Sequence, residues 1–134
     1  MNNDKKIIIV EDDSDINNLI AYNLRKEGFN VEQVFDGSSA QGRLQNENFD
    51  IAILDIMLPG VDGLELCRLV KANPRNFYTF IMMVSAKAQE EDKLIAQLLG
   101  ADCYLSKPFS LTRLLNTVRE VSANLDKQFL VISG

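Results

Sequence analysis

The segment 51–63, which reads IAILDIMLPGVDG, constrains the fold of this chain more than any other. Its first four residues are apolar and of strand length, a pattern typical of a strand buried on both faces of a sheet. Asp55 ends the apolar run, and the Pro, Gly and Asp residues that follow predict a turn or loop. The segment therefore predicts a strand that carries one carboxylate to the edge of a sheet, where open α/β sheets bind ligands. Taken alone, the pattern fits equally an aspartate that only caps a turn.

Strand and helix patterns alternate five times along the chain. The expected strands span 6–10, 31–35, 51–54, 80–84 and 102–106, and the expected helices span 14–27, 38–47, 64–72, 89–99 and the region from 110 onward. In the first helix we expect Ile16, Leu19, Ile20 and Leu24 to face the core, and in the fourth helix Leu94, Ile95 and Leu98. This alternation predicts an α/β fold with a doubly wound parallel sheet. A length of 134 residues fits one domain.

Composition excludes several classes of function. The net charge of −5 disfavours direct binding to nucleic acid, which needs clustered Lys and Arg. The absence of histidine excludes Ser-His-Asp and Cys-His catalysis, histidine metal ligands and a histidine phosphocarrier within the chain. Cys67 and Cys103 lack CxxC spacing, so we expect two ordinary thiols. The first apolar run has only four residues, too short for a signal peptide or a membrane span, which predicts a cytoplasmic protein.

Polar residues follow four of the five expected strands. Glu11 and Asp12 come after the first strand, Asp55 after the third, Ser85 after the fourth and Lys107 after the fifth. Because the carboxyl ends of parallel strands share one edge of a sheet, we expect these side chains to converge. Oxygen ligands alone favour a hard cation such as Mg²⁺ near the acidic residues. The alternative interpretation of this acidic run is a helix start capped by the residue at 13 or 14.

Three carboxylates, a hydroxyl and an ammonium suit phosphoryl transfer to an aspartate. Aspartate can attack phosphorus as a nucleophile. The transferring group carries negative charge on its equatorial oxygens, so a cation held by Asp12 and Asp55 and the ammonium of Lys107 would neutralise it. Ser85 would add a hydrogen bond. Aspartate phosphatases use similar groups and form an alternative, but they have a second aspartate two residues after the nucleophile, where this chain has Met57.

Four ordered motifs resemble the response-regulator receiver domains of two-component signalling. They are IIIVEDD, LDIMLPGVDG, VSAK and YLSKPF, and the match covers about residues 5–123. The resemblance implies a flavodoxin-like (βα)5 fold, with a five-stranded parallel sheet in the order 2-1-3-4-5 and helices on both faces. It also implies a signalling switch rather than an enzyme with its own substrate.

The resemblance assigns a role to each motif residue. Asp55 matches the phospho-accepting aspartate, and Ser85 and Lys107 match the residues that contact the phosphoryl group. The expected ligands of Mg²⁺, or of Mn²⁺ as a substitute, are the carboxylates of Asp12 and Asp55, Glu11 through water, and the backbone carbonyl of Met57. The remaining matches are Tyr104, at the aromatic switch position, Lys87, at a variable position beside the site, and the bond from Lys107 to Pro108, often cis in the family.

The resemblance also implies partners. The phosphoryl donor would be a sensor histidine kinase or a histidine phosphotransfer protein, and the output would pass to an effector or a fused output domain. The face of the fourth helix, fifth strand and fifth helix would change on phosphorylation. Relatives often dimerise through opposite charges there, whereas Lys93 and Arg113 would repel each other. We expect a domain at 1–124, and we interpret 125–134 as a tail, an added extended segment, a linker or a partner contact.

Overall fold

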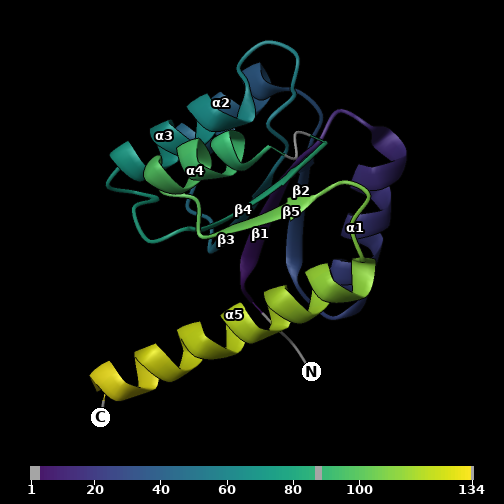
Figure 1. Ribbon diagram of the computed structural model, residues 1–134. Helices are drawn as coiled ribbons and strands as arrows, with labels where there is room; N and C mark the ends of the chain where they lie inside the picture. The colour runs from purple at the N-terminus through teal and green to yellow at the C-terminus, as the bar shows by residue number, and fades with distance from the viewer. Residues whose placement is uncertain (1–3, 87–88, 134) are drawn as a thin grey trace.

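The computed structural model describes residues 4–86 and 89–133, and five parallel strands form one sheet within them (Figure 1). The strand order is β2-β1-β3-β4-β5, as the resemblance implied. The strands are β1 Lys6–Val10, β2 Asn30–Val34, β3 Ile51–Leu54, β4 Phe80–Ser85 and β5 Cys103–Ser106. Val10 pairs with Val34 on one side and with Leu54 on the other, so the first three strands end at the same level.

Helices cover both faces of the sheet. They are α1 Ser14–Lys26, α2 Gly37–Asn46, α3 Gly63–Ala72, α4 Glu90–Leu98 and α5 Leu111–Ser133. Figure 1 shows α1 and α5 on one face and α2, α3 and α4 on the other. Asp13, Asp36 and Asp62 cap the first three helices by accepting backbone N–H bonds. The glycines after α1 and α4, Gly28 and Gly100, adopt φ angles of 93° and 109°, which favour glycine at a helix end.

Two hydrophobic clusters, one on each face, form the core. Alternate residues of β1 point into different clusters: Ile7 and Ile9 pack with α1 and α5, whereas Ile8 and Val10 pack with α2, α3 and α4. All four residues of β3 are buried. This double burial explains the continuous apolar runs that predicted a parallel sheet. The thiol of Cys67 is buried and that of Cys103 is half-buried, and both are free.

The predicted inward face of α4 was wrong. Leu94 and Leu98 are 56% and 77% exposed, and Ile95 is also exposed. The buried residue of the helix is Ala96, a small side chain that lets the backbone lie close to the sheet. Because the helix contacts the sheet through a small residue, the larger side chains beside it point outward. Their helical spacing revealed an apolar stripe but not which side of the helix meets the core.

Leu19 of α1 is also exposed rather than buried. Ile20 and Leu24 are buried as predicted, Ile16 is partly buried, and the other buried positions of the helix hold Asn17 and Ala21. At the other end of the chain, α5 continues to Ser133, so the backbone of 125–133 is helical and not an extended segment. Within the described residues no helix combines the length and the apolar composition needed to cross a membrane.

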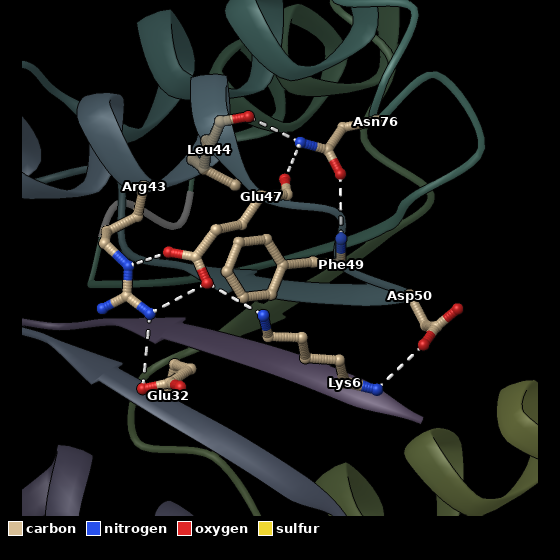
Figure 2. Close-up of polar contacts among 8 residues, drawn as sticks. All are labelled: Lys6, Glu32, Arg43, Leu44, Glu47, Phe49, Asp50 and Asn76. Carbon is tan, nitrogen blue, oxygen red and sulfur yellow. Dashed lines mark hydrogen bonds and ion pairs between the residues drawn. The ribbon is translucent and has the colours of Figure 1, made fainter. Parts of the chain in front are cut away.

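A polar network ties together the edge of the sheet where the strands begin (Figure 2). The Lys6 ammonium lies 2.8 Å from Glu47 Oε1 and 4.9 Å from the centre of the Phe49 ring. The Arg43 guanidinium also pairs with Glu47. Asp50 accepts the backbone N–H of Lys6 at 2.8 Å. Hydrogen bonds from Arg43, and then from Lys6, lower the pKa of Glu47 to about 2.

This network predicts a pH-dependent contribution to stability. Glu47→Gln should lower the free energy of unfolding by about 1 kcal/mol at pH 7, the upper range for partly exposed ion pairs. Because the folded pKa of Glu47 lies below its ordinary value of 4.5, the loss should be full above about pH 4.5 and shrink as the pH falls toward 2. Urea unfolding between pH 7 and pH 3 measures it.

Glu65→Gln is the matched control, because among the described residues the Glu65 carboxylate forms an ion pair with Arg68 alone, on the exposed surface of the same helix. Its effect should be smaller at every pH. A loss in Glu47→Gln that stays constant or grows toward pH 3 would contradict this account of the network.

Candidate functional site

Asp55 lies directly after β3, at the edge of the sheet where the strands end. Its backbone N–H donates to the carbonyl of Val10 at 3.0 Å, which continues the pairing between β3 and β1 by one residue. One carboxylate oxygen, Oδ1, accepts the backbone N–H of Met57 at 2.9 Å. The side chain is almost fully buried. The central strand and the following turn therefore hold this carboxylate in one position.

Lys107 reaches this carboxylate from the loop after β5. Its ammonium lies 2.8 Å from Asp55 Oδ2 and 2.5 Å from Glu11 Oε1, and its side chain is 18% exposed. The backbone N–H of Lys107 donates to the carbonyl of Ser85 at 2.8 Å, and the bond to Pro108 is cis, as the resemblance implied. Burial lowers the pKa of Lys107, but hydrogen bonds to Asp55 and Glu11 outweigh it, so the pKa is raised and the ammonium stays charged.

Glu11 is buried beside this ammonium. Burial raises the pKa of Glu11 to about 7, although the hydrogen bonds from Lys107 and from the backbone N–H of Asp13 partly offset it. The Asp13 N–H donates to Glu11 Oε2 at 3.1 Å. Asp13 itself caps α1, as the helix-start interpretation expected, while the carboxylates of Glu11 and Asp12 lie near that of Asp55.

Glu11, Asp12 and Asp55 can hold a metal ion by their geometry. Each offers one carboxylate oxygen, and these oxygens lie within 4.8 Å of one another. Asp12 is exposed and lines a hollow of 500 Å³ together with Met57. Oxygen donors with open solvent on one side suit Mg²⁺, which keeps several waters and binds through one or two carboxylates. The donor set therefore fits the expected divalent ion.

Ser85 and Tyr104 lie on the neighbouring strands β4 and β5, near the ends of the strands where Asp55 also lies. Ser85 ends β4 and is fully buried, and it pairs with Ser106 of β5. Burial raises the pKa of the Tyr104 hydroxyl, with a contribution from Asp92, while a side-chain hydrogen bond with Ser85 acts in the opposite direction. The Lys93 ammonium of α4 lies 5.9 Å from the centre of the Tyr104 ring. The two residues at the expected switch positions are thus in contact.

Gly63 lies against the backbone of Asp55, although the sequence pattern predicted only that it belongs to a turn. A Cβ at Gly63 would lie 2.1 Å from the carbonyl oxygen of Asp55 and 2.8 Å from the Cα of Ile56. The first turn of α3 is therefore pressed against the backbone that carries the carboxylate. Such a close approach is set by the path of the loop, and only comparison across related sequences could have indicated it. Lys87, which the resemblance placed beside the site, lies outside the described residues.

The five-stranded parallel sheet and the acidic pocket at the ends of its strands define a CheY-like α/β domain with a candidate cation site. The family model described as "Response regulator receiver domain" matches residues 7–119, so the chain belongs to the response regulator receiver domains of two-component systems.

Solved structures of receiver proteins are similar over almost the whole chain. A CheY-like receiver domain protein from Methanospirillum hungatei is 31% identical, with a TM-score of 0.84, over 93% of this chain and 98% of that one. The chemotaxis protein CheY4 of Vibrio cholerae is 30% identical, with a TM-score of 0.81, over 88% and 98%. The Thermotoga maritima OmpR/PhoB homologue DrrB is 29% identical, with a TM-score of 0.80, and the match covers 93% of this chain but 54% of DrrB.

The contact between Gly63 and Asp55 predicts a cost for any side chain at that position. Gly63→Ala should lower the free energy of unfolding by about 1–3 kcal/mol, because the backbone atoms around the added methyl group must shift. Gly42→Ala is the matched control in α2, since a Cβ there would meet no atom within 4 Å. It should raise stability by about 0.5–1 kcal/mol through helix propensity.

Urea unfolding of both variants at one pH measures these effects. A Gly63→Ala protein as stable as the wild type would mean that α3 does not press against the Asp55 backbone.

Proposed function

We propose that Asp55 accepts a phosphoryl group from a phosphohistidine on a sensor kinase or histidine phosphotransfer protein, and that this switches the surface of the domain. The observation that carries the proposal is the contact of one ammonium, Lys107, with the buried carboxylates of Asp55 and Glu11 beside Asp12. The donor histidine lies outside these 134 residues, because they contain no histidine. The domain would then act as a signalling switch rather than as an enzyme with its own substrate.

In the transfer step an oxygen of Asp55 attacks phosphorus. A bond from phosphorus to this oxygen forms while the bond to the donor imidazole nitrogen breaks, and the imidazole leaves with its electron pair. Lys107 already contacts Asp55 at 2.8 Å, so it needs only a small movement to pair with the incoming phosphoryl oxygens. The backbone N–H of Met57 orients the carboxylate through its other oxygen. When bound, Mg²⁺ supplies positive charge that offsets repulsion between the carboxylates and the phosphoryl group.

The phosphorylation signal would leave the site through Ser85 and Tyr104. A phosphoryl oxygen competes for the Ser85 hydroxyl, which takes part in a hydrogen bond with Tyr104 in the unphosphorylated protein. Loss of that bond frees Tyr104 to repack against α4, where Lys93 lies near its ring. The exposed side chains of Leu94 and Leu98 on the same helix support α4, β5 and α5 as the surface that changes its partner.

We further propose residues 1–124 as the receiver domain of a cytoplasmic protein and 125–134 as a tail or linker. Its partner would be a separate effector or a fused output domain. The printed description of DrrB as an OmpR/PhoB homologue, with a chain almost twice as long as the matched region, supports a fused output domain as one arrangement. A dimer that forms on phosphorylation would have to avoid repulsion between Lys93 and Arg113.

Acetyl phosphate with Mg²⁺ tests the proposed acceptor. The wild type should gain the mass of one phosphoryl group, measured by intact-protein mass spectrometry, and Asp55→Asn should gain none because an amide is not a nucleophile for phosphorus. Chelation of the divalent ion with EDTA should also suppress the gain in the wild type.

Asp62→Asn is the control, since Asp62 lies in the hollow beside Asp12 and its cap on α3 is kept by asparagine. It should be phosphorylated like the wild type. A mass gain in Asp55→Asn equal to that of the wild type would refute the assignment.

A further inference from the structure

A fully buried asparagine, Asn17, forms hydrogen bonds to the backbone of the acidic loop, which comprises residues 11–13 after β1. Asn17 lies on the inward face of α1 and is 0% exposed, at a position where the helix otherwise buries apolar side chains such as Ile20 and Leu24. Burying an amide costs free energy unless its donors and acceptor find partners. A residue of this kind on an inward face therefore needs a specific reason.

Each polar group of the Asn17 side chain has a partner. The amide nitrogen donates to the backbone carbonyl of Glu11 at 3.0 Å and to that of Val34 at 2.9 Å. The amide oxygen accepts a hydrogen bond from the side chain of Gln33 at 3.0 Å. Two carbonyls on one side and an amide donor on the other fix the orientation of the Asn17 amide, because the reverse orientation would set oxygen against oxygen.

These bonds fix Glu11 at both of its backbone groups. Its N–H donates to the Val34 carbonyl at 3.1 Å, and its own carbonyl is the one that Asn17 holds. The residue whose carboxylate contacts Lys107 is thus anchored between β2 and α1, and Asp12 follows directly. Without the Asn17 amide the Glu11 carbonyl would lose its hydrogen bond from the helix, and this peptide could rotate.

We propose that Asn17 is a positioning residue that sets the backbone of the acidic loop and thereby the geometry in which Glu11 and Asp12 receive the divalent ion. This inference rests on the proposed function for the identity of the ion. Gln33 belongs to the same device: its side-chain nitrogen also donates to Asn18 at 2.8 Å, and its oxygen accepts from Arg25 at 2.8 Å. A chain of hydrogen bonds thus runs from the exposed edge of β2 to the loop.

The chain offers a matched control at the opposite edge of the sheet. Asn76 is 1% exposed, and its amide nitrogen donates to the carbonyls of Leu44 and Glu47 at 2.6 and 2.8 Å (Figure 2). Its amide oxygen accepts the backbone N–H of Phe49 at 2.9 Å. Both asparagines are buried, and in each the amide nitrogen donates to two backbone carbonyls. The oxygen of Asn76 accepts from the Thr79 hydroxyl as well, and Asn76 lies where the strands begin and not where they end.

Asn17→Leu and Asn76→Leu separate positioning from stability. Both should lower the free energy of unfolding, because each leaves a buried backbone carbonyl without its partner. The dissociation constant for Mg²⁺, measured by calorimetry where both variants are folded, should rise about 10-fold in Asn17→Leu, as for other residues that orient metal ligands. In Asn76→Leu it should match the wild type. Equal affinities in the two variants would overturn the proposal.

Hydrogen exchange without metal tests the positioning directly. The amide of Glu11 should exchange about 10-fold faster in Asn17→Leu than in Asn76→Leu, even when the two are compared at equal global stability. Equal exchange would overturn the proposal whatever the ion. A wild type that binds no Mg²⁺ would instead refute the proposed function, and the exchange result would still stand.

Gln33→Ala provides a second variant in case Asn17→Leu does not fold. It keeps the buried asparagine and removes the donor that orients its amide, together with the Gln33 hydrogen bonds to Asn18 and Arg25 at the surface. Weaker Mg²⁺ binding and faster Glu11 exchange in Gln33→Ala would support the proposal, and wild-type values for both would overturn it.

Discussion

The Lys107 ammonium makes the rest of the site possible. Asp55 and Glu11 are both buried, and burial raises the pKa of Glu11. Lys107 lies within 3 Å of both, so one positive charge compensates two negative groups from strands far apart in sequence. Its own burial would favour loss of the proton, and the paired carboxylates reverse that effect. The three groups therefore depend on one another.

The sheet builds this cluster at one edge and secures the other edge by different means. Where the strands end, charged side chains converge and Asp12 remains open to solvent. Where the strands begin, Lys6 and Arg43 form ion pairs with Glu47, and Asn76 donates to the carbonyls of Leu44 and Glu47 at the end of α2. These ion pairs link α2 to β1, so the role of the charged residues at this end of the sheet is structural.

The sequence predicted the ends of β1, β3 and β5 and the residues that gather there, and it missed the ends of β2 and β4 by one residue. Asp55 directly follows an apolar run and Lys107 follows the expected fifth strand, and the geometry of a parallel sheet brings them together without knowledge of any side-chain contact. The inward face of α4 could not be predicted in this way. Leu94 and Leu98 form an apolar stripe, whereas the helix meets the sheet through Ala96, and spacing does not distinguish a core face from an exposed one.

Two other features of the site were also beyond the sequence. The polar side chain of Asn17 gave no sign that it would be buried, because its partners are backbone carbonyls whose positions depend on the packing of α1 against β2. The close approach of Gly63 to Asp55 depends on the path of the connecting loop. Asn17 and Gly63 both contact backbone atoms of another segment. The pattern of apolar and polar side chains along the sequence does not predict such contacts.

A crystal structure of the protein with Mg²⁺ and beryllofluoride, a mimic of the phosphoryl group, tests the central claim most directly. The account predicts beryllofluoride on the Asp55 carboxylate in contact with Lys107 and Ser85, and Mg²⁺ bound by Asp12, Asp55 and the carbonyl of Met57. Beryllofluoride on another carboxylate, or Lys107 turned away from an occupied Asp55, would contradict it.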